Sequence, residues 1–302
     1  MDEAPGREAH TTLNSKKGKI SAMPLVDTHV HLFDPDRFPY HASASYKPPA
    51  APLDPYLKFA LEAKIDHTII VHPEPYQDDH RYLEYCFQNE PRKGFFKGTC
   101  LFDPIAKSTE SRLQMLTAKW PGRIVALRIH ANQGLDKQPT TSGPIRDRDL
   151  RHPQMRATWQ MAHHLGLAIQ MHFVPAQAVR IHELAERFPQ VPVVLDHLGR
   201  AGQGTKSEVD AVIALALLPR TIMKFSGLNY TSKQPPPHAD LQPLIRKYFE
   251  VFGARRILWG GLGMNMAEYN AQRHAFDSLF SFATAADRAL IEGANAKSIF
   301  SL

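Results

Sequence analysis

Histidines close several of the apolar segments that we expect to form β-strands. The first of these segments, residues 26–31, reads Val-Asp-Thr-His-Val-His. Side chains of a strand alternate between its two faces, so Asp27, His29 and His31 share one face and the valines the other, which would pack on helices. Two imidazoles spaced in this way can chelate one divalent ion or bracket one polarised carbonyl group. The segment therefore indicates either a metal site or a site for carbonyl chemistry.

Four later segments of the same kind also end in polar side chains. Arg128 shares a face with His130, and Gln170 shares a face with His172. The next two segments contribute His197, Lys224 and Ser226. Burying imidazoles in a barrel interior costs desolvation, so packing alone does not explain the set. We predict a catalytic or ligand-binding mouth, at which six of the 16 histidines lie: His29, His31, His72, His130, His172 and His197.

A regular succession of strands and helices is needed to bring these side chains to one mouth. Eight short segments rich in β-branched residues are predicted strands: 25–32, 68–72, 96–101, 124–130, 168–173, 193–197, 222–226 and 257–260. Segments of helical period separate and follow them: 55–63, 79–89, 109–119, 154–165, 176–188, 207–217, 241–252, 267–282 and a short one at 286–292.

This alternation predicts an α/β fold, a single (β/α)8 TIM-type barrel over residues 23–302, preceded by a disordered polar tail over residues 1–22. An open, doubly wound sheet is the alternative, but no glycine-rich phosphate loop follows the first strand. Long insertions follow the first and fourth strands, at 34–52 and 131–153. Loops after the strands of such a barrel lie on its catalytic face, so both insertions are candidate lids or substrate walls.

Composition excludes several classes of protein. The 302 residues include two cysteines, which rules out a disulfide scaffold and a cysteine-built zinc cluster. Lys and Arg exceed Asp and Glu by 36 to 30, and the net charge of +6 is spread thinly, which suits a small anionic substrate and not a nucleic acid. No apolar run reaches the roughly 18 residues of a membrane helix, and no secretory signal is recognisable. We expect a cytoplasmic protein with no membrane partner; a homo-oligomer stays open.

The ordered set of strand ends resembles that of the amidohydrolase superfamily (amidohydrolase-related family 2). Within it, the chain is most similar to the subgroup of lactone hydrolases typified by 2-pyrone-4,6-dicarboxylate lactonase. The His-x-His motif alone is weak, whereas the ordered set is specific. The matching segments are Val-Asp-Thr-His-Val-His-Leu-Phe-Asp-Pro (26–35), Val-Ala-Leu-Arg-Ile-His (125–130), Ile-Gln-Met-His-Phe (169–173), Val-Val-Leu-Asp-His-Leu-Gly-Arg (193–200), Met-Lys-Phe-Ser-Gly-Leu-Asn-Tyr (223–230), Arg-Ile-Leu-Trp-Gly (256–260) and Gly-Ala-Asn-Ala (293–296).

The resemblance implies roles for the polar strand ends. His29, His31 and His172 would be metal ligands in a metal-using member, or carbonyl polarisers in a metal-free one. His197 would handle a proton or stabilise an oxyanion. Residues at which relatives hold substrate carboxylates are Arg128, Arg200 and Tyr230, and guanidinium groups suit that task because they bind a carboxylate bidentately. We expect the other polar residues of the mouth to contact substrate as well: His130, Lys224 and Ser226.

One position departs from the family pattern. After the eighth strand the family reads Trp/Phe-Gly-Ser-Asp-Trp-Pro, and its Asp is the general base and often a metal ligand. Here the chain reads Trp-Gly-Gly-Leu-Gly-Met-Asn (259–265), with Leu262 in place of the Asp. Leucine cannot take a proton from water, so a mechanism that uses this Asp is not available. Asn265 and Glu268 are nearby substitutes, although Glu268 is expected to begin the eighth helix.

Three functions follow as hypotheses. The first is hydrolysis of a small lactone or related carboxylated ring, with water activated by a histidine of near-normal pKa. The second is a non-hydrolytic lyase or isomerase (decarboxylase, dehydratase or cyclase), which the loss of the Asp favours. The third is a non-catalytic binding barrel. We expect no cofactor; the alternative is one zinc or manganese ion on His29, His31 and His172.

Overall fold

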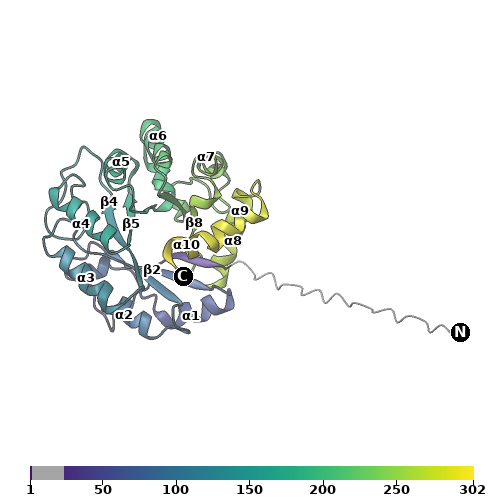
Figure 1. Cartoon of the computed structure of the whole chain (residues 1–302), viewed down its shortest axis with the longest axis horizontal. Helices are drawn as coiled ribbons and strands as arrows, with labels where there is room; N and C mark the ends of the chain where they lie inside the picture. The colour runs from purple at the N-terminus through teal and green to yellow at the C-terminus, as the bar shows by residue number, and fades with distance from the viewer. Residues whose placement is uncertain (2–23) are drawn as a thin grey trace.

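Eight parallel strands form one sheet in the order in which they occur along the chain. The computed structural model describes residue 1 and residues 24–302, so the predicted tail falls outside the described residues apart from Met1. Figure 1 shows the strands at the centre of a ring of helices, which confirms the (β/α)8 barrel and excludes the open sheet. The strands are β1 (Val26–Val30), β2 (His67–Val71), β3 (Phe96–Cys100), β4 (Ile124–Ala131), β5 (Ala168–Phe173), β6 (Val193–Leu195), β7 (Thr221–Phe225) and β8 (Ile257–Trp259).

The helices lie outside the sheet, where their apolar faces cover it. The helices are α1 (Leu53–Glu62), α2 (Arg81–Gln88), α3 (Thr109–Lys119), α4 (Pro153–His164), α5 (Ala178–Arg187), α6 (Lys206–Ala214), α7 (Gln242–Phe252), α8 (Met266–Leu279), α9 (Ala285–Ala289) and α10 (Asn295–Phe300). The predicted helix at 286–292 lies within a longer helical stretch, in which α9 ends at Ala289 and a π-helix (Leu290–Ala294) leads directly into α10. The closing helix α10 was not indicated by the sequence pattern.

The interior of the barrel is layered along its axis. The lowest layer is apolar and includes Val26, Val194 and Leu258, and α10 closes it from below with Ala296 and Phe300. Figure 1 shows α10 and the C-terminus over the centre of the ring. Because inward positions recur every second residue, the next two layers follow from the sequence. The middle layer holds Arg128, Gln170, Asp196 and Lys224, and the upper one His130, His172 and Ser226.

Strand β1 breaks the expected alternation. Val26 lies in the interior cluster, and Val30 packs in the outer core between sheet and helices. The pairing of β1 with β2 shifts its register between Asp27 and Val30, as at a β-bulge. At this irregularity the side chains change the face of the sheet on which they lie. The expectation that both valines point outward is therefore wrong for Val26, while His29 still reaches the interior.

Side chains of β1 connect it to β8. Gly261 and Leu262 donate from their backbone nitrogens to the carboxylate of Asp27, at 2.8 and 3.3 Å. Thr28 Oγ1 donates to the carbonyl oxygen of Trp259 at 2.7 Å. These bonds hold the first strand against the last strand and against the loop that follows it, so the barrel closes around the mouth.

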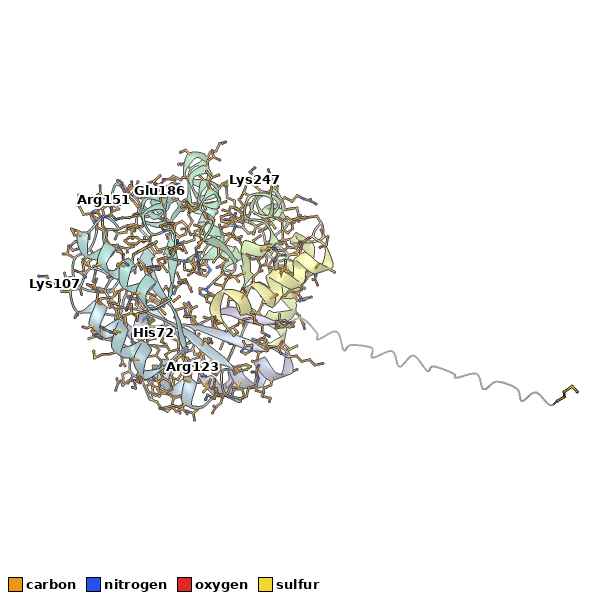
Figure 2. All side chains as sticks on the ribbon, in the orientation of Figure 1. His72, Lys107, Arg123, Arg151, Glu186 and Lys247 are labelled. Atoms are coloured by element: carbon orange, nitrogen blue, oxygen red, sulfur yellow. The ribbon has the colours of Figure 1, made fainter. Side chains whose placement is uncertain are left out.

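The two long loops after β1 and β4 meet over this mouth. Arg146, in the β4 loop, donates to Ser45 Oγ in the β1 loop at 3.0 Å. Lys107 and Lys247 lie at the outer edge of the molecule in Figure 2, whereas His72 lies inside the ring of helices. In the part of the chain that the structure describes, none of the helices combines the length and apolar character that a membrane crossing requires.

Candidate active site

A cavity of about 210 Å³ opens where the strands end, and histidines and arginines dominate its wall. It lies above the polar layers of the barrel interior, on the side of the long loops. Its lining residues are His31, Tyr46, Glu74, Arg128, His130, Asn132, Arg146, His172, His197 and Tyr230.

The two histidines of β1 form a directly interacting pair. His29 Nε2 and His31 Nε2 lie 3.2 Å apart, and His31 Nδ1 lies 2.7 Å from the carbonyl oxygen of Val71. A carbonyl can only accept, so His31 Nδ1 carries its proton and His31 Nε2 is an acceptor. His29 Nε2 then donates to it. His29 Nδ1 is left without a proton, which agrees with its 3.6 Å separation from Asp196 and its lack of a hydrogen-bond partner among the described residues.

His197 is held by an unusual turn at the end of β6. The strand stops at Leu195, two residues before the predicted end, and residues 197–200 all have positive φ angles. His197 Nδ1 lies 2.9 Å from Ser226 Oγ at the end of β7. A Cβ at Gly227 would clash with His197 Nδ1, and the φ of +54° at Gly227 also favours glycine. The Ser226 hydroxyl and the close approach of Gly227 thus hold one ring nitrogen of His197 in place, while the residue lines the cavity.

Burial keeps the histidines of the site neutral. It lowers the pKa of His31 and of His197 to about 3. Burial also lowers the pKa well below the ordinary value in the remaining members of the set: His29, His130 and His172. The expected base of near-normal pKa is therefore wrong for His197. These imidazoles act as neutral donors and acceptors over the physiological range.

A buried charge cluster lies beneath the histidines. Lys224 Nζ is 3.3 Å from Asp196 Oδ1, and an Nη of Arg128 donates to Asp196 Oδ2 at 3.2 Å. Gln170 Nε2 lies 3.0 Å from both oxygens, and Lys224 also donates to the carbonyl of Thr28. Burial alone would raise the pKa of Asp196, but Lys224 and the other neighbours hold it well below its usual range. The carboxylate is ionised and fully engaged.

The residues present do not form a good site for a divalent metal. In the described part of the chain, the one group of at least three potential ligands whose atoms lie within 4.8 Å of one another is His29, Asp196 and His197. It differs from the predicted set, because Asp196 and His197 take the places of His31 and His172. Both oxygens of Asp196 already accept from other groups, and two of these are cations that would repel a metal ion. The pairing of His29 with His31 also satisfies those nitrogens without an ion.

Most of the predicted site residues lie around the cavity. Six of the ten line it: His31, Arg128, His130, His172, His197 and Tyr230. Three lie immediately behind the wall: His29, Lys224 and Ser226. Arg200 is beside it, donating to Asn132 Oδ1 at 2.7 Å with its guanidinium 4.8 Å from the Tyr230 ring centre. His72 is buried, lies 2.9 Å from the carbonyl of Gln77 and is not part of the wall.

Four lining residues were not predicted. Tyr46, Asn132 and Arg146 come from the two insertions that were expected to be lids or substrate walls, and Glu74 follows β2. The position of the insertions identified the segments, but a loop has no period from which the facing of one side chain can be derived. Glu74 could have been found as a polar residue directly after a strand.

Leu262 does not plug the cavity. It is completely buried in the outer core and is not among the lining residues. Glu268 is not placed as a substitute base, because it lies in the first turn of α8 behind the N-cap Asn265, and its carboxylate accepts from Met264 N at 2.7 Å and from Asn265 Nδ2 at 2.8 Å. Among the residues that line the cavity, the single carboxylate is that of Glu74.

Known proteins are similar to this chain in sequence or in fold. Among curated sequences, the chain is similar to the 4-sulfomuconolactone hydrolase of Hydrogenophaga intermedia, with 26% identity over 241 residues that cover 78% of this chain and 72% of that protein. Its fold is similar to the crystal structure of a probable 2-pyrone-4,6-dicarboxylic acid hydrolase from Acinetobacter baumannii with citric acid bound. That pair has a TM-score of 0.75 and 19% identity, covering 93% of this chain and 100% of the other.

The fold also extends to a lyase. A 2,6-dihydroxybenzoate decarboxylase from Rhizobium superposes with a TM-score of 0.62 and 14% identity, covering 92% of this chain and 99% of that one. At such identities the likeness concerns the fold alone. The sequence model of one family, described as Amidohydrolase, matches residues 26–302. The resemblance of the strand ends is thereby confirmed, and the chain belongs to the amidohydrolase family.

Proposed function

We propose that this protein hydrolyses a small lactone that carries a carboxylate or similar anionic group, without a metal cofactor. The observation that carries the proposal is the meeting of neutral histidines and guanidinium groups in one cavity. Lactone hydrolysis needs a polarised carbonyl and a path for the proton of water, and an anionic substrate needs cations. The names of the relatives, a sulfomuconolactone hydrolase and a pyrone-dicarboxylic acid hydrolase, agree with this substrate class.

The arginines of the cavity are suited to hold the anionic group. Arg128 and Arg146 line the wall, and Arg200 stands behind Asn132. In the described chain, the Nε atoms of Arg128 and Arg200 are buried and have no hydrogen-bond partner. Buried donors without partners are rare in proteins, so these N–H groups are well placed to be satisfied by a substrate.

The histidines divide the chemical work. His172 Nε2 is buried without a partner from any described residue, so it is free to donate to the lactone carbonyl. His197 has Nδ1 occupied by Ser226, which leaves Nε2 to receive the proton of the attacking water and to return it to the ring oxygen as the acyl C–O bond of the lactone breaks. Although its pKa is about 3, negative charge that develops on the carbonyl oxygen raises the proton affinity of a neighbouring imidazole. His29 positions His31 through the hydrogen bond between them.

A lyase is the second candidate, and Leu262 favours it. The family's base is absent at this position, and decarboxylation needs proton transfer and an anion clamp but no activated water. The two reactions differ in what they release, since a decarboxylase produces CO₂ and a lactonase produces a new acid. Measuring both products from one substrate panel separates the hypotheses.

Purified protein is assayed against carboxylated γ- and δ-lactones to test the proposal. Hydrolysis is monitored as the loss of the lactone's absorbance and as the release of acid. We expect hydrolysis of at least one lactone, and a decrease in kcat of about 100-fold or more in both His172→Ala and His197→Ala. Circular dichroism of each variant controls for folding. Hydrolysis that persists at the wild-type rate in both variants would contradict the assignment of the site.

A further inference from the structure

The cavity contains one carboxylate that the proposed reaction does not use. Glu74 lines the cavity from the 3-10 turn Glu74–Tyr76 after β2, and only 3% of the residue is exposed. Its Oε2 atom is buried and has no hydrogen-bond partner within the described chain. A buried carboxylate oxygen without a donor is unfavourable, so a ligand that supplies a donor would be bound more tightly.

The other oxygen of Glu74 accepts hydrogen bonds from two loops, and a third loop holds the two donor residues in place. Gln77 Nε2 donates to Oε1 at 2.8 Å, and the backbone nitrogen of Ser45 donates to it at 3.4 Å. Gln77 Oε1 in turn accepts from the backbone nitrogen of Ile145, and Arg146 donates to Ser45 Oγ. The carboxylate is therefore held in place where the β1, β2 and β4 loops meet. Its orientation is set before a ligand arrives, which lowers the entropic cost of binding.

The cavity wall carries charged side chains of both signs. Arg128 and Arg146 are its cations and Glu74 its anion. The field of all three reaches Tyr46: burial raises the pKa of its phenol, Glu74 raises it further, and the arginines lower it. An anionic group of a ligand is attracted to the arginines and repelled by Glu74, whereas a hydroxyl group finds an acceptor in Glu74.

We infer that Glu74 is a specificity-determining residue that selects ring substrates with one anionic group and one hydrogen-bond donor, such as a hydroxyl, over ring dianions. The inference rests on the proposed function only in that the substrate occupies the histidine cavity. A dianion that places one charge on the arginines would bring its second charge against the carboxylate of Glu74, which repels it. A hydroxyl would satisfy Oε2 with a charge-assisted hydrogen bond.

Binding of two matched probes tests this inference without requiring turnover. The probes are 3-hydroxybenzoate, with one carboxylate and one hydroxyl, and isophthalate, with two carboxylates in the same relative positions. Dissociation constants are measured by calorimetry for the wild type, Glu74→Gln and Glu62→Gln. In Glu74→Gln, the amide keeps an oxygen that can accept from Ser45 and Gln77 but loses the charge. Glu62 is exposed on α1, so its variant removes the same charge elsewhere.

We expect the wild type and Glu62→Gln to bind 3-hydroxybenzoate about tenfold or more tightly than isophthalate, and Glu74→Gln to lose most of this preference. An unchanged ratio in Glu74→Gln, a wild-type preference for isophthalate, or no binding of either probe would overturn the inference. The same preparations are assayed for lactone hydrolysis. A wild-type protein that shows the preference but hydrolyses no lactone would contradict the proposed function alone, and the selectivity of Glu74 would stand.

Discussion

The ammonium group of Lys224 lies 3.3 Å from the carboxylate of Asp196, and both side chains are completely buried in the barrel interior. Asp196 belongs to the end of β6 and Lys224 to β7, and Lys224 also donates to the backbone of β1 at Thr28. The pair therefore links three parts of the barrel directly beneath the histidines. Its removal affects both stability and the geometry of the cavity, which makes it the first subject for mutagenesis.

Replacing Lys224 by Met leaves Asp196 buried with one cation fewer. Breaking a buried ion pair on one side costs about 3–5 kcal/mol, because the remaining charge stays desolvated. We expect that loss in the free energy of unfolding for Lys224→Met, measured by chemical denaturation. The double variant Asp196→Asn/Lys224→Met removes both charges, so its cost should be smaller than the sum of the single variants. Strictly additive costs would show that the two groups do not interact.

Acid should destabilise the protein through its buried histidines. The pKa of His31 and of His197 is 6.5 in the unfolded chain and about 3 in the folded one. Between these values the unfolded chain binds more protons, so stability is fully present above pH 6.5 and is lost as the pH falls toward 3. At about pH 5, each of the two contributes a loss of up to about 2 kcal/mol relative to neutral pH.

Urea denaturation at about pH 7.5 and about pH 5 measures this loss. The variant His31→Asn should show a weaker dependence on pH, because one of the depressed groups is gone. His274→Asn, which changes an exposed histidine on α8, serves as the control and should keep the wild-type dependence. Equal stability of the wild-type protein at both pH values would refute the lowered pKa of these histidines.

Restoring the family's carboxylate should not restore a base. Leu262 is completely buried, and its backbone nitrogen donates to the carboxylate of Asp27 at 3.3 Å. Leu262→Asp would place a second carboxylate in an apolar setting near the first, at a cost of several kcal/mol. We expect a clear fall in melting temperature and no gain in lactone hydrolysis. A gain of hydrolysis with unchanged stability would show that this side chain reaches the substrate.

The metal-free proposal predicts the metal content of the protein. Protein purified without chelators should contain zinc and manganese far below one ion per chain by elemental analysis. Treatment with EDTA and addition of zinc should leave the rate of hydrolysis unchanged, because both oxygens of Asp196 are engaged by its neighbours. Stoichiometric zinc, lost together with activity on chelation, would refute the proposal and support the metal alternative.

A methyl group at Gly227 should disturb the site through His197. The added Cβ would clash with His197 Nδ1, so Gly227→Ala must displace the ring or the turn. We expect a fall in kcat of roughly tenfold or more, since small misplacements of catalytic groups are costly. Gly122→Ala is the matched control, because Gly122 also has a positive φ, of +68°, but has open space at its Cβ. An equal loss of activity in both variants would point to backbone strain alone.

The alternation of strand and helix segments was sufficient to predict the barrel and the polar side chains at its mouth. Alternation with a period of two residues assigns Arg128 with His130, and Gln170 with His172, to inward layers, whatever the surrounding loops do. The same reasoning failed in β1, where a register shift reversed the facing of Val26. It also could not show that β6 ends early, because the left-handed turn at His197 is stabilised by contacts with β7.

The loop residues that complete the site and the charge state of its histidines depend on contacts that exist only in the folded protein. Glu74 and Arg146 are far apart in the chain, and they share a wall only because bonds among three loops hold them there. The low pKa of His197 and the ionised state of Asp196 arise from burial and from neighbours on other strands. Local pattern specifies which way a strand residue faces, whereas desolvation and charge pairing depend on segments that meet only in the folded protein.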